Sequence, residues 1–211
     1  MPLQRLDINP IIRPADVEPS QEGYEVLGVF NCGAVKIEDE HVLLLRVAEK
    51  PPREDGWISI PMLNDACDAV EVRRLREDEP GMDATDSRLV RLADGSVLLT
   101  SISHLRLARS RDGRSFTVEP RPTLFPSAPT ERYGIEDPRV TPLEGRWWIN
   151  YSAVSETGVV TALASTGDWS SFERHGVMFA PTDKDVCIFP EQVGGRYVCR
   201  HRPWAEGIGK P

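Results

Sequence analysis

The segment that decides the fold reads Tyr133-Gly-Ile-Glu-Asp-Pro-Arg139 and continues Val-Thr-Pro-Leu-Glu-Gly-Arg-Trp-Trp-Ile-Asn-Tyr-Ser152. Residues that favour β-strands lie on both sides of Glu144-Gly145, a pair typical of a tight hairpin turn. Two adjacent carboxylates and an arginine come at the start of the first strand. The segment therefore predicts a β-hairpin that carries charged groups where it begins.

Similar hairpins recur along the chain. Three units can be aligned by their turn glycines, namely residues 87–101 with Gly95, 138–152 with Gly145 and 188–201 with Gly195. After the first two units a second similarity follows, between residues 110–116 (SRDGRSF) and 166–172 (TGDWSSF). Strands and turns that repeat about every fifty residues are typical of a β-propeller, whose blades must stack to bury their faces.

We therefore expect an all-β protein of the β-propeller type, with about four blades encoded in 211 residues. A β-sandwich with coincidental spacing is the alternative, since sandwiches also alternate short strands and turns. Residues 205–211 resemble the start of another connection, so the ring is expected to be incomplete. An open blade edge of this kind predicts association with another chain, including a homo-oligomer.

The domain organisation follows from composition. Residues 1–24 are rich in proline and predict an N-terminal arm, and residues 25–211 are expected to form the propeller domain. Within that domain, residues 26–35 and 41–48 predict a hairpin closed by the acidic turn 38–40. Residues 62–81 mix acidic and basic side chains and are expected to form a loop or an outer strand.

The bulk composition excludes several classes of protein. With 40% hydrophobic and 27% charged residues the chain is globular, and its net charge of -8 disfavours nucleic acid and anionic membranes as partners. The sequence has no hydrophobic leader and no apolar run of membrane-spanning length, which predicts a cytoplasmic protein. Its four cysteines lack the spacing of a metal site or a redox motif and are expected to be reduced. Among the classes of partner considered, a small molecule is therefore the one that we expect.

No motif in the sequence indicates a cofactor or a metal ion. The phosphate-binding glycine patterns GxGxxG and GxxxxGK are absent, and the histidines and cysteines do not have zinc-ligand spacing. The charged residues of EDPR can equally form a solvated surface turn, and Lys184 can pair with the aspartates on either side of it. Likewise, His201 can be a rim residue, Arg46 a strand cap and Asn31 a turn residue beside Gly33.

Several segments together resemble glycoside hydrolase family 130, which contains β-mannoside phosphorylases and some β-mannosidases. The resemblance extends over residues 27–211 and is most specific in the combination of EDPR, KDxxxFPE and HRP. The matching segments are FNCGAV around Asn31, LLLR ending at Arg46, SHLRLARSRDGRSF from Ser103, YGIEDPRVT from Tyr133, INYSAVS from Ile149, DKDVCIFPE from Asp183 and HRP from His201. The resemblance implies a five-bladed propeller with the sugar site at its central funnel, completed by C-terminal blades beyond this sequence.

The chemistry of glycoside cleavage gives these residues their roles. A carboxylic acid must protonate the leaving oxygen, and an inverting phosphorylase needs cationic groups that hold the attacking phosphate. By the resemblance, Asp137 is the proton donor, and Lys184 and His201 bind phosphate, with Arg174 as a further phosphate candidate. Asn31, Arg46, Glu136 and Arg139 are expected to bind the substrate.

Two further expectations concern the geometry of EDPR. Asp137 precedes a proline, which favours an extended backbone, and Glu136 is expected on the opposite face of the strand, where it contacts a sugar hydroxyl or Arg139. The aromatic residues Trp147, Trp148 and Tyr151 are more typical of core packing than of sugar stacking.

The expected function is inverting phosphorolysis of β-1,4-mannosides to α-mannose 1-phosphate, with inorganic phosphate as co-substrate and no cofactor. Two alternatives stay open, namely a β-mannosidase that uses water and a non-catalytic sugar-binding remnant. Residues 147–173 contain no Lys, Arg or His, although phosphorylases of the family tend to place an arginine in the blade after EDPR.

Overall fold

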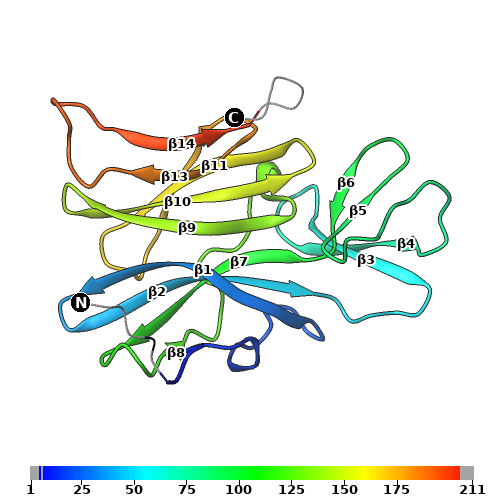
Figure 1. The fold of residues 1–211 in the computed structure, drawn as a ribbon, viewed down its shortest axis with the longest axis horizontal. Coiled ribbons are helices and arrows are strands. Elements are labelled where there is room, and N and C mark those ends of the chain that lie inside the picture. Colours follow the sequence, from blue (N-terminus) through cyan, green and yellow to red (C-terminus); the bar gives the residue numbers. More distant parts are fainter. Residues whose placement is uncertain (1–4, 6, 205–211) are drawn as a thin grey trace.

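The computed structural model describes residue 5 and residues 7–204, which form an all-β protein with two short 3-10 helices (Figure 1). The expected all-β class is confirmed. The elements in chain order are η1 (Pro14–Asp16), β1 (Glu25–Ile37), β2 (Glu40–Lys50), β3 (Trp57–Leu63), β4 (Val70–Arg76), β5 (Leu89–Arg91), β6 (Val97–Leu99), β7 (Ile102–Ser110), β8 (Thr117–Val118), η2 (Pro129–Glu131), β9 (Gly134–Leu143), β10 (Arg146–Ser155), β11 (Gly158–Thr166), β12 (Glu173–Phe179), β13 (Asp183–Ile188) and β14 (Cys199–Pro203).

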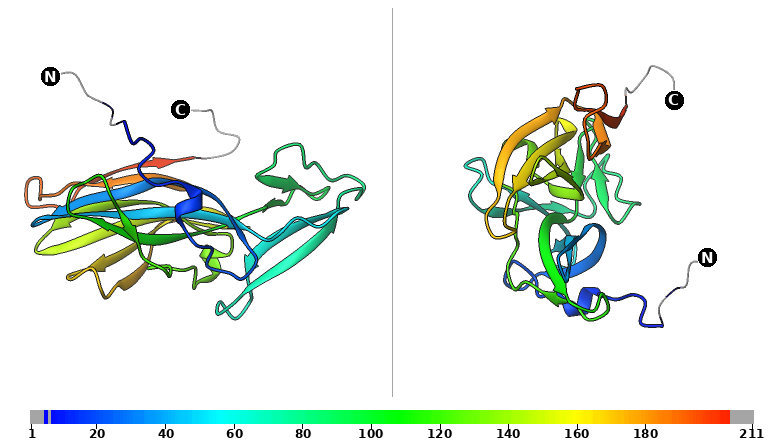
Figure 2. Two further views of the ribbon diagram at one scale, coloured as in Figure 1. Left: turned by 90° about the horizontal axis from the view of Figure 1, so that it is seen from below. Right: turned by 90° about the vertical axis from the view of Figure 1, so that its left-hand side faces the viewer.

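The largest sheet has eight strands and divides into two antiparallel sets of four. The first set is β1-β2-β7-β8 and the second is β9-β10-β11-β12. One parallel pair, Ser103 opposite Gly134, joins β7 to β9 and so links the sets. In the right-hand view of Figure 2 the yellow and orange strands lie on one side and the blue and green strands on the other. The hairpin β13-β14 is a separate two-stranded sheet.

The expectation of about four equivalent blades is wrong for the residues that the structure describes. Residues 57–99 leave the first set between β2 and β7 and form two small separate sheets, β3-β4 and β5-β6. The aligned unit around Gly95 is the hairpin β5-β6, whereas the unit around Gly145 opens a four-stranded set. The regular spacing of the turn glycines wrongly indicated equivalent blades, because tight hairpins of different sheets all favour a residue with positive φ at the turn. The five-bladed ring stays a prediction.

Other local predictions are confirmed. The hairpin expected over residues 26–48 is β1-β2, and β9 pairs with β10 across the Glu144-Gly145 turn. The aligned turns after β7 and β11 are built alike, because Asp112 and Asp168 each accept backbone hydrogen bonds from residues two and three positions ahead. Residues 62–81, expected as a loop or an outer strand, contain the end of β3 and all of β4.

The main core lies between the two four-stranded sets. Leu44 on β2 and Leu105 on β7 pack with Ile135 on β9 and Ile149 on β10, and all four are fully buried. Tyr151 is buried in the same cluster and Trp147 packs against it, which agrees with the core role expected for these aromatics. Burial of each large apolar side chain contributes about 1.5–3 kcal/mol, so this cluster fixes the position of β9 beside β2.

The N-terminal segment is anchored by a buried charged group. Glu49 accepts hydrogen bonds from the backbone N–H of Ser20 at 2.7 Å and from His104 Nε2 at 3.1 Å. Arg106 donates to the carbonyl of Glu18 at 2.7 Å. The side chains of Glu49, His104 and Arg106 are wholly buried, so these bonds tie residues 18–20 to β2 and β7.

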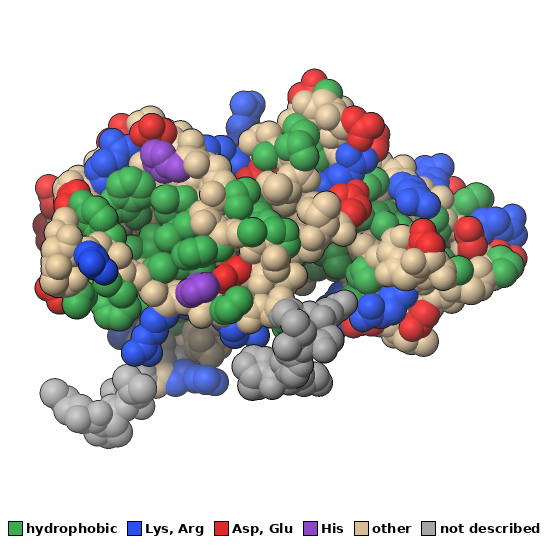
Figure 3. Space-filling view, turned by 90° about the horizontal axis from the view of Figure 1, so that it is seen from above, with side chains coloured by type: hydrophobic (Ala, Val, Ile, Leu, Met, Phe, Trp, Pro, Cys, Tyr) green, Lys and Arg blue, Asp and Glu red, His purple; other side chains and the backbone are tan. Residues whose placement is uncertain are grey.

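Hydrophobic side chains gather on the face of β11 to β14, with charged groups around them (Figure 3). Val177, Val193, Tyr197 and Trp204 are each about half exposed. Whether a further chain covers this face stays a prediction. The expected continuation at residues 205–211 lies outside the described residues, and among the described helices none is long and apolar enough to cross a membrane.

Replacement of Gly134 by alanine should destabilise the junction between the two sets. Gly134 has φ +117, and a Cβ there would overlap the backbone of Ser103. We expect Gly134→Ala to lower the free energy of unfolding by about 3 kcal/mol, measured by chemical denaturation. Gly145→Ala is the matched control, since Gly145 also has positive φ (+75) but nothing within 4 Å. An equal loss in both variants would contradict the junction role.

The anchor of the N-terminal segment should make stability depend on pH. Burial lowers the pKa of His104 below its usual 6.5, so the folded protein holds it neutral and unfolding lets it gain a proton. Stability should therefore fall as pH decreases through 6.5 towards the lowered value, by at most about 1.4 kcal/mol per pH unit. Melting curves between pH 8 and 5 check this, and His104→Gln should flatten the slope. An unchanged slope in that variant would assign the dependence to other groups.

Candidate functional site

The site is built around one arginine that binds two neighbouring carboxylates. Arg46 on β2 places Nη2 2.7 Å from Glu136 Oε1 and Nη1 2.9 Å from Asp137 Oδ1. Asn31 on β1 donates to the same Oδ1 of Asp137 at 2.9 Å. Four residues that the sequence nominated from three distant segments thus meet in one cluster. Arg46 is not the strand cap that the alternative reading suggested.

The arrangement of Glu136 and Asp137 differs from the expected one. Strand alternation predicted opposite faces, but both carboxylates bind the same guanidinium. The ladder between β9 and β10 shifts register between Asn150 and Ser152, opposite this dipeptide, and Asp137 has φ 52 instead of an extended backbone. The bulge turns Asp137 towards the side of Glu136, because an extra residue interrupts alternation locally.

A second bulge brings Asn31 to Asp137. The β1-β2 ladder shifts register between Phe30 and Gly33, and Asn31 has φ 47, a left-handed value that asparagine tolerates. A Cβ at Gly33 would lie 2.7 Å from Val140 Cγ2 and 3.3 Å from the carbonyl oxygen of Pro138, so β1 passes very close to β9. Asn31 therefore lies at a bulge within β1 and not in the turn that the alternative reading suggested, and it binds the site carboxylate.

Two residues that sequence reasoning missed hold Arg46 in place. Its Nε donates to Ser103 Oγ at 3.3 Å, and its guanidinium lies 4.6 Å from the centre of the Phe30 ring. Phe30 adjoins Asn31, and Ser103 opens the SHLRLARS segment, so both were in quoted motifs. No sequence pattern indicated that either would contact Arg46. Stacking and hydrogen bonding fix the guanidinium plane, which a lysine could not reproduce.

Burial and the neighbouring charges shift the pKa of Glu136. Burial is the main cause that raises the pKa of Glu136, and the charge of Asp137 adds to it. Arg46 and then Lys184 act in the opposite direction. Folding therefore disfavours the ionised form of Glu136, which is typical of a functional group rather than a stabilising one.

The phosphate candidates Lys184 and His201 lie on the paired strands β13 and β14. His201 Nδ1 is 2.6 Å from Oδ2 of the buried Asp183, and its ring stacks on Phe179 with 4.7 Å between ring centres. Asp183 is therefore an unpredicted partner that orients the imidazole and leaves Nε2 for a ligand. His201 remains partly exposed, with 42% of its side chain accessible.

Lys184 is not paired with its aspartate neighbours. Asp183 contacts His201, and Asp185 contacts Arg202 and, at 3.9 Å, Arg139. Within residues 7–204 Lys184 forms no ion pair, although its charge is close enough to influence Glu136. Its ammonium group is therefore available beside the carboxylate cluster.

The observed contacts do not support Arg139 as the partner of Glu136 or Arg174 as a phosphate ligand of the cluster. Arg139 is 57% exposed and lies beside Asp185, while Glu136 binds Arg46. Arg174 on β12 donates to both oxygens of buried Glu131 at 2.8 Å and to Tyr151 Oη at 3.3 Å. Arg174 therefore joins β12 to η2 and β10. Since β12 is three strands from β9, about 14 Å away, Arg174 is not in the cluster. The sequence showed its charge but not its buried partner.

Comparison with known proteins gives these residues a context. The model of a family described as beta-1,4-mannooligosaccharide phosphorylase matches residues 93–207. A Beta-1,2-mannobiose phosphorylase of Listeria innocua is 44% identical over 99% of this chain, which spans 60% of that protein's length. Its structure in complex with beta-1,2-mannobiose superimposes with a TM-score of 0.92 over 97% of this chain and 59% of the other.

More distant proteins support the family and the fold. A 1,2-beta-oligomannan phosphorylase of Thermoanaerobacter is 31% identical over 50% of this chain and 36% of its own length. A glycosyl hydrolase from Bacteroides ovatus, 19% identical, shares the fold with a TM-score of 0.62 over 92% of this chain and 51% of its own. Since the family model matches more than half of the sequence, the chain belongs to glycoside hydrolase family 130.

Proposed function

We propose that this chain carries the site for inverting phosphorolysis of a β-mannoside. Asp137 donates its proton to the glycosidic oxygen, and an oxygen of inorganic phosphate forms a bond to the anomeric carbon as the bond to the leaving group breaks. The products are α-mannose 1-phosphate and the shortened saccharide. Similarity to a mannobiose phosphorylase supports the substrate class, and the chain's 60% coverage of that relative leaves the activity of the chain alone to be tested.

One observation carries this proposal most directly, namely the use of the two oxygens of Asp137. Asn31 and Arg46 both donate to Oδ1. Among the described residues Oδ2 has no such donor, so it is the atom that can present a proton to the substrate. Bonds to one oxygen of a carboxyl group fix the direction of the other, which is the positioning that general acid catalysis needs.

Lys184 and His201 are the proposed phosphate ligands. Lys184 supplies an ammonium group that is not neutralised within residues 7–204, and the contact of Asp183 with Nδ1 of His201 leaves Nε2 without a hydrogen-bond partner among these residues. Charge-assisted hydrogen bonds to phosphate oxygens are among the strongest that a protein forms. Arg46 contacts both carboxylates of the cluster, and Arg139 is the remaining candidate for a substrate contact.

The linkage that is cleaved is part of the proposal. Similarity favours β-1,2-mannobiose, because the 44% identical relative acts on that disaccharide. The β-1,4 linkage expected from sequence has support from the family description and from a Beta-1,4-mannooligosaccharide phosphorylase of Ruminococcus albus, 30% identical over 46% of this chain. Hydrolysis is the second candidate, since the His201–Asp183 pair has the geometry of an oriented base.

Incubation with β-1,2- and β-1,4-mannobiose, with and without phosphate, tests both reaction and linkage. We expect mannose 1-phosphate only when phosphate is present, and Asp137→Asn should lower its rate by about 10²- to 10⁴-fold, because the proton donor is lost. Asp94→Asn, at an exposed turn outside the site, is the matched control. Free mannose without phosphate dependence would assign hydrolysis. Cleavage that persists in Asp137→Asn would remove Asp137 from its role.

Replacement of Lys184 should weaken phosphate selectively. We expect Lys184→Met to raise KM for phosphate at least about tenfold while KM for the mannoside changes little, since one charge-assisted contact is worth about 1.5–3 kcal/mol. Initial rates at varied phosphate and fixed mannoside give both constants. Lys36→Met on β1 serves as the control lysine. Equal increases in both KM values would place Lys184 at the sugar and not at phosphate.

A further inference from the structure

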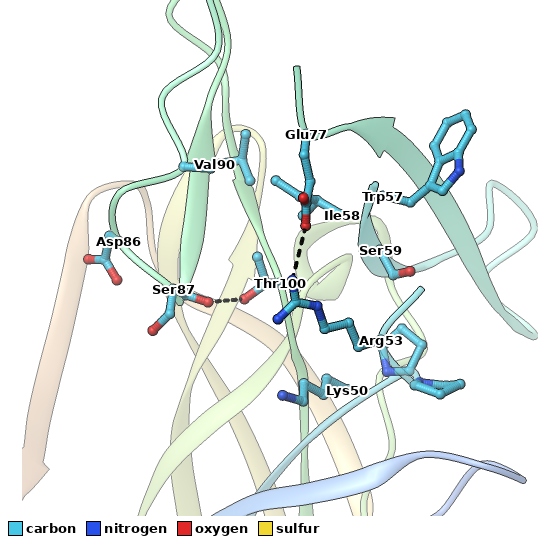
Figure 4. Close-up of a pocket in the computed structure, with 13 residues that line it drawn as sticks. Lys50, Arg53, Trp57, Ile58, Ser59, Glu77, Asp86, Ser87, Val90 and Thr100 are labelled. Atoms are coloured by element: carbon cyan, nitrogen blue, oxygen red, sulfur yellow. Dashed lines mark hydrogen bonds and ion pairs between the residues drawn. The ribbon is translucent and has the colours of Figure 1, made fainter. Parts of the chain in front are cut away.

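A hollow of about 360 Å³ lies beyond the end of β2, and none of the site residues described above lines it (Figure 4). Its walls come from residues 50–53, from β3, and from the segments around β4, β5 and β6. Figure 4 shows Lys50, Arg53, Glu77 and Thr100 gathered around one space, with Ser87 at its side. The volume is at the lower end of the range for small-molecule sites, which suits a mono- or disaccharide unit.

The lining has the chemistry of a site for a neutral polyhydroxyl ligand. Lys50 and Arg53 contribute two cationic side chains to the lining, and Glu77 and Asp86 contribute two carboxylates, so the charges balance. Such a set offers donors and acceptors in equal measure, which fits sugar hydroxyls better than an anion or a cation. The hydroxyl groups in the lining belong to Ser59, Ser87 and Thr100, and the apolar surface for sugar C–H groups belongs to Pro51, Pro52, Ile58 and Val90.

Arg53 and Glu77 are not committed to a strong internal contact, whereas Arg88 holds Asp86 at 2.7 Å. Arg53 Nη2 and Glu77 Oε1 are 3.7 Å apart, with 76% and 45% of their side chains exposed. An exposed pair at that distance contributes little to stability, so a ligand hydroxyl can replace it at small loss. Thr100 Oγ1 donates to the carbonyl of Ser87 and keeps its lone pairs for an incoming donor.

The hollow lies on the same face of β2 as Arg46 of the candidate active site. Residues two apart in a strand share a face, so Arg46 and Lys50 lie on the same face of β2. Four residues of strand separate them by about 13 Å. A mannoside whose cleaved bond lies at Asp137, and which follows β2, reaches the hollow within a few sugar units.

We propose that this hollow is a remote saccharide subsite that holds the far end of β-mannosides longer than a disaccharide. The inference rests on the proposed function, because it assumes that the cleaved bond lies at Asp137. Arg53 and Glu77 hydrogen-bond the distal sugar, and the apolar lining packs against its ring. The site thereby favours oligosaccharides over mannobiose by affinity.

Calorimetric titration with uncleaved ligands tests this subsite. The protein carries Asp137→Asn so that bound saccharide is not turned over, and the probes are mannobiose and mannotetraose in both the β-1,2 and β-1,4 linkages. We expect one tetrasaccharide to bind about tenfold more tightly than its disaccharide, or about 1.4 kcal/mol. The added double change Arg53→Ala and Glu77→Ala should reduce this preference to within about twofold. Circular dichroism of each variant verifies folding.

The control is the neighbouring pair Arg74 and Glu54, 3.2 Å apart, similarly exposed and outside the hollow. Its double alanine variant should keep the preference for the tetrasaccharide. Equal affinity for the two lengths, or a preference that survives loss of Arg53 and Glu77, would overturn the subsite and leave the proposed function standing. Absence of binding by every probe would overturn the proposed substrate class and the subsite with it.

Discussion

The bidentate contact of Arg46 with Glu136 and Asp137 is the interaction on which the site depends. It joins β2 of the first four-stranded set to β9 of the second at 2.7 and 2.9 Å, beside the single parallel pair that connects the sets. The hydrophobic core between the sets fixes the distance across which the guanidinium reaches. A planar fork with several donors can bind two carboxylates at once, which a lysine ammonium cannot do with the same geometry.

The site combines groups that a protein selected only for stability would avoid. Asn31 and Asp137 have left-handed backbones at 47° and 52°, both strands are bulged, and Glu136 is a carboxyl group whose ionisation burial opposes. Each left-handed non-glycine residue costs about 1–3 kcal/mol, and such residues cluster where chemistry is performed. The buried core and the anchored N-terminal segment offset this loss, so the irregular strands persist in one arrangement.

Much of the fold could be predicted from hydrophobic pattern and turn chemistry, because these are local. The hairpins β1-β2 and β9-β10 follow from strand-forming residues around a turn. The assembly of hairpins into sets is not local, and the unit around Gly95 was mistaken for a blade because its turn is like the others. The excursion of residues 57–99 from the main sheet depends on packing partners that a single sequence does not display.

The non-local nature of strand pairing also explains which parts of the candidate site could not be predicted from the sequence. Asn31, Arg46, Glu136 and Asp137 were nominated by motif and do meet, yet period-two alternation wrongly separated the carboxylates because it cannot reveal a bulge. Arg174 was nominated by charge, although Glu131 holds it elsewhere. Asp183 was one possible partner of Lys184 and instead binds His201. Pairing across strands decides such cases, and it becomes visible only in the folded chain.

A double-mutant cycle between Arg46 and Asp137 tests the central interaction most directly. The free energy of unfolding is measured by denaturant titration for Arg46→Met, Asp137→Asn and the double variant. A coupling energy of about 1–2 kcal/mol is expected. Each single variant already lacks the charge-assisted bond between Arg46 and Asp137, so the double variant does not lose it a second time. Strictly additive losses would contradict the role of Arg46 as the group that holds the two carboxylates together.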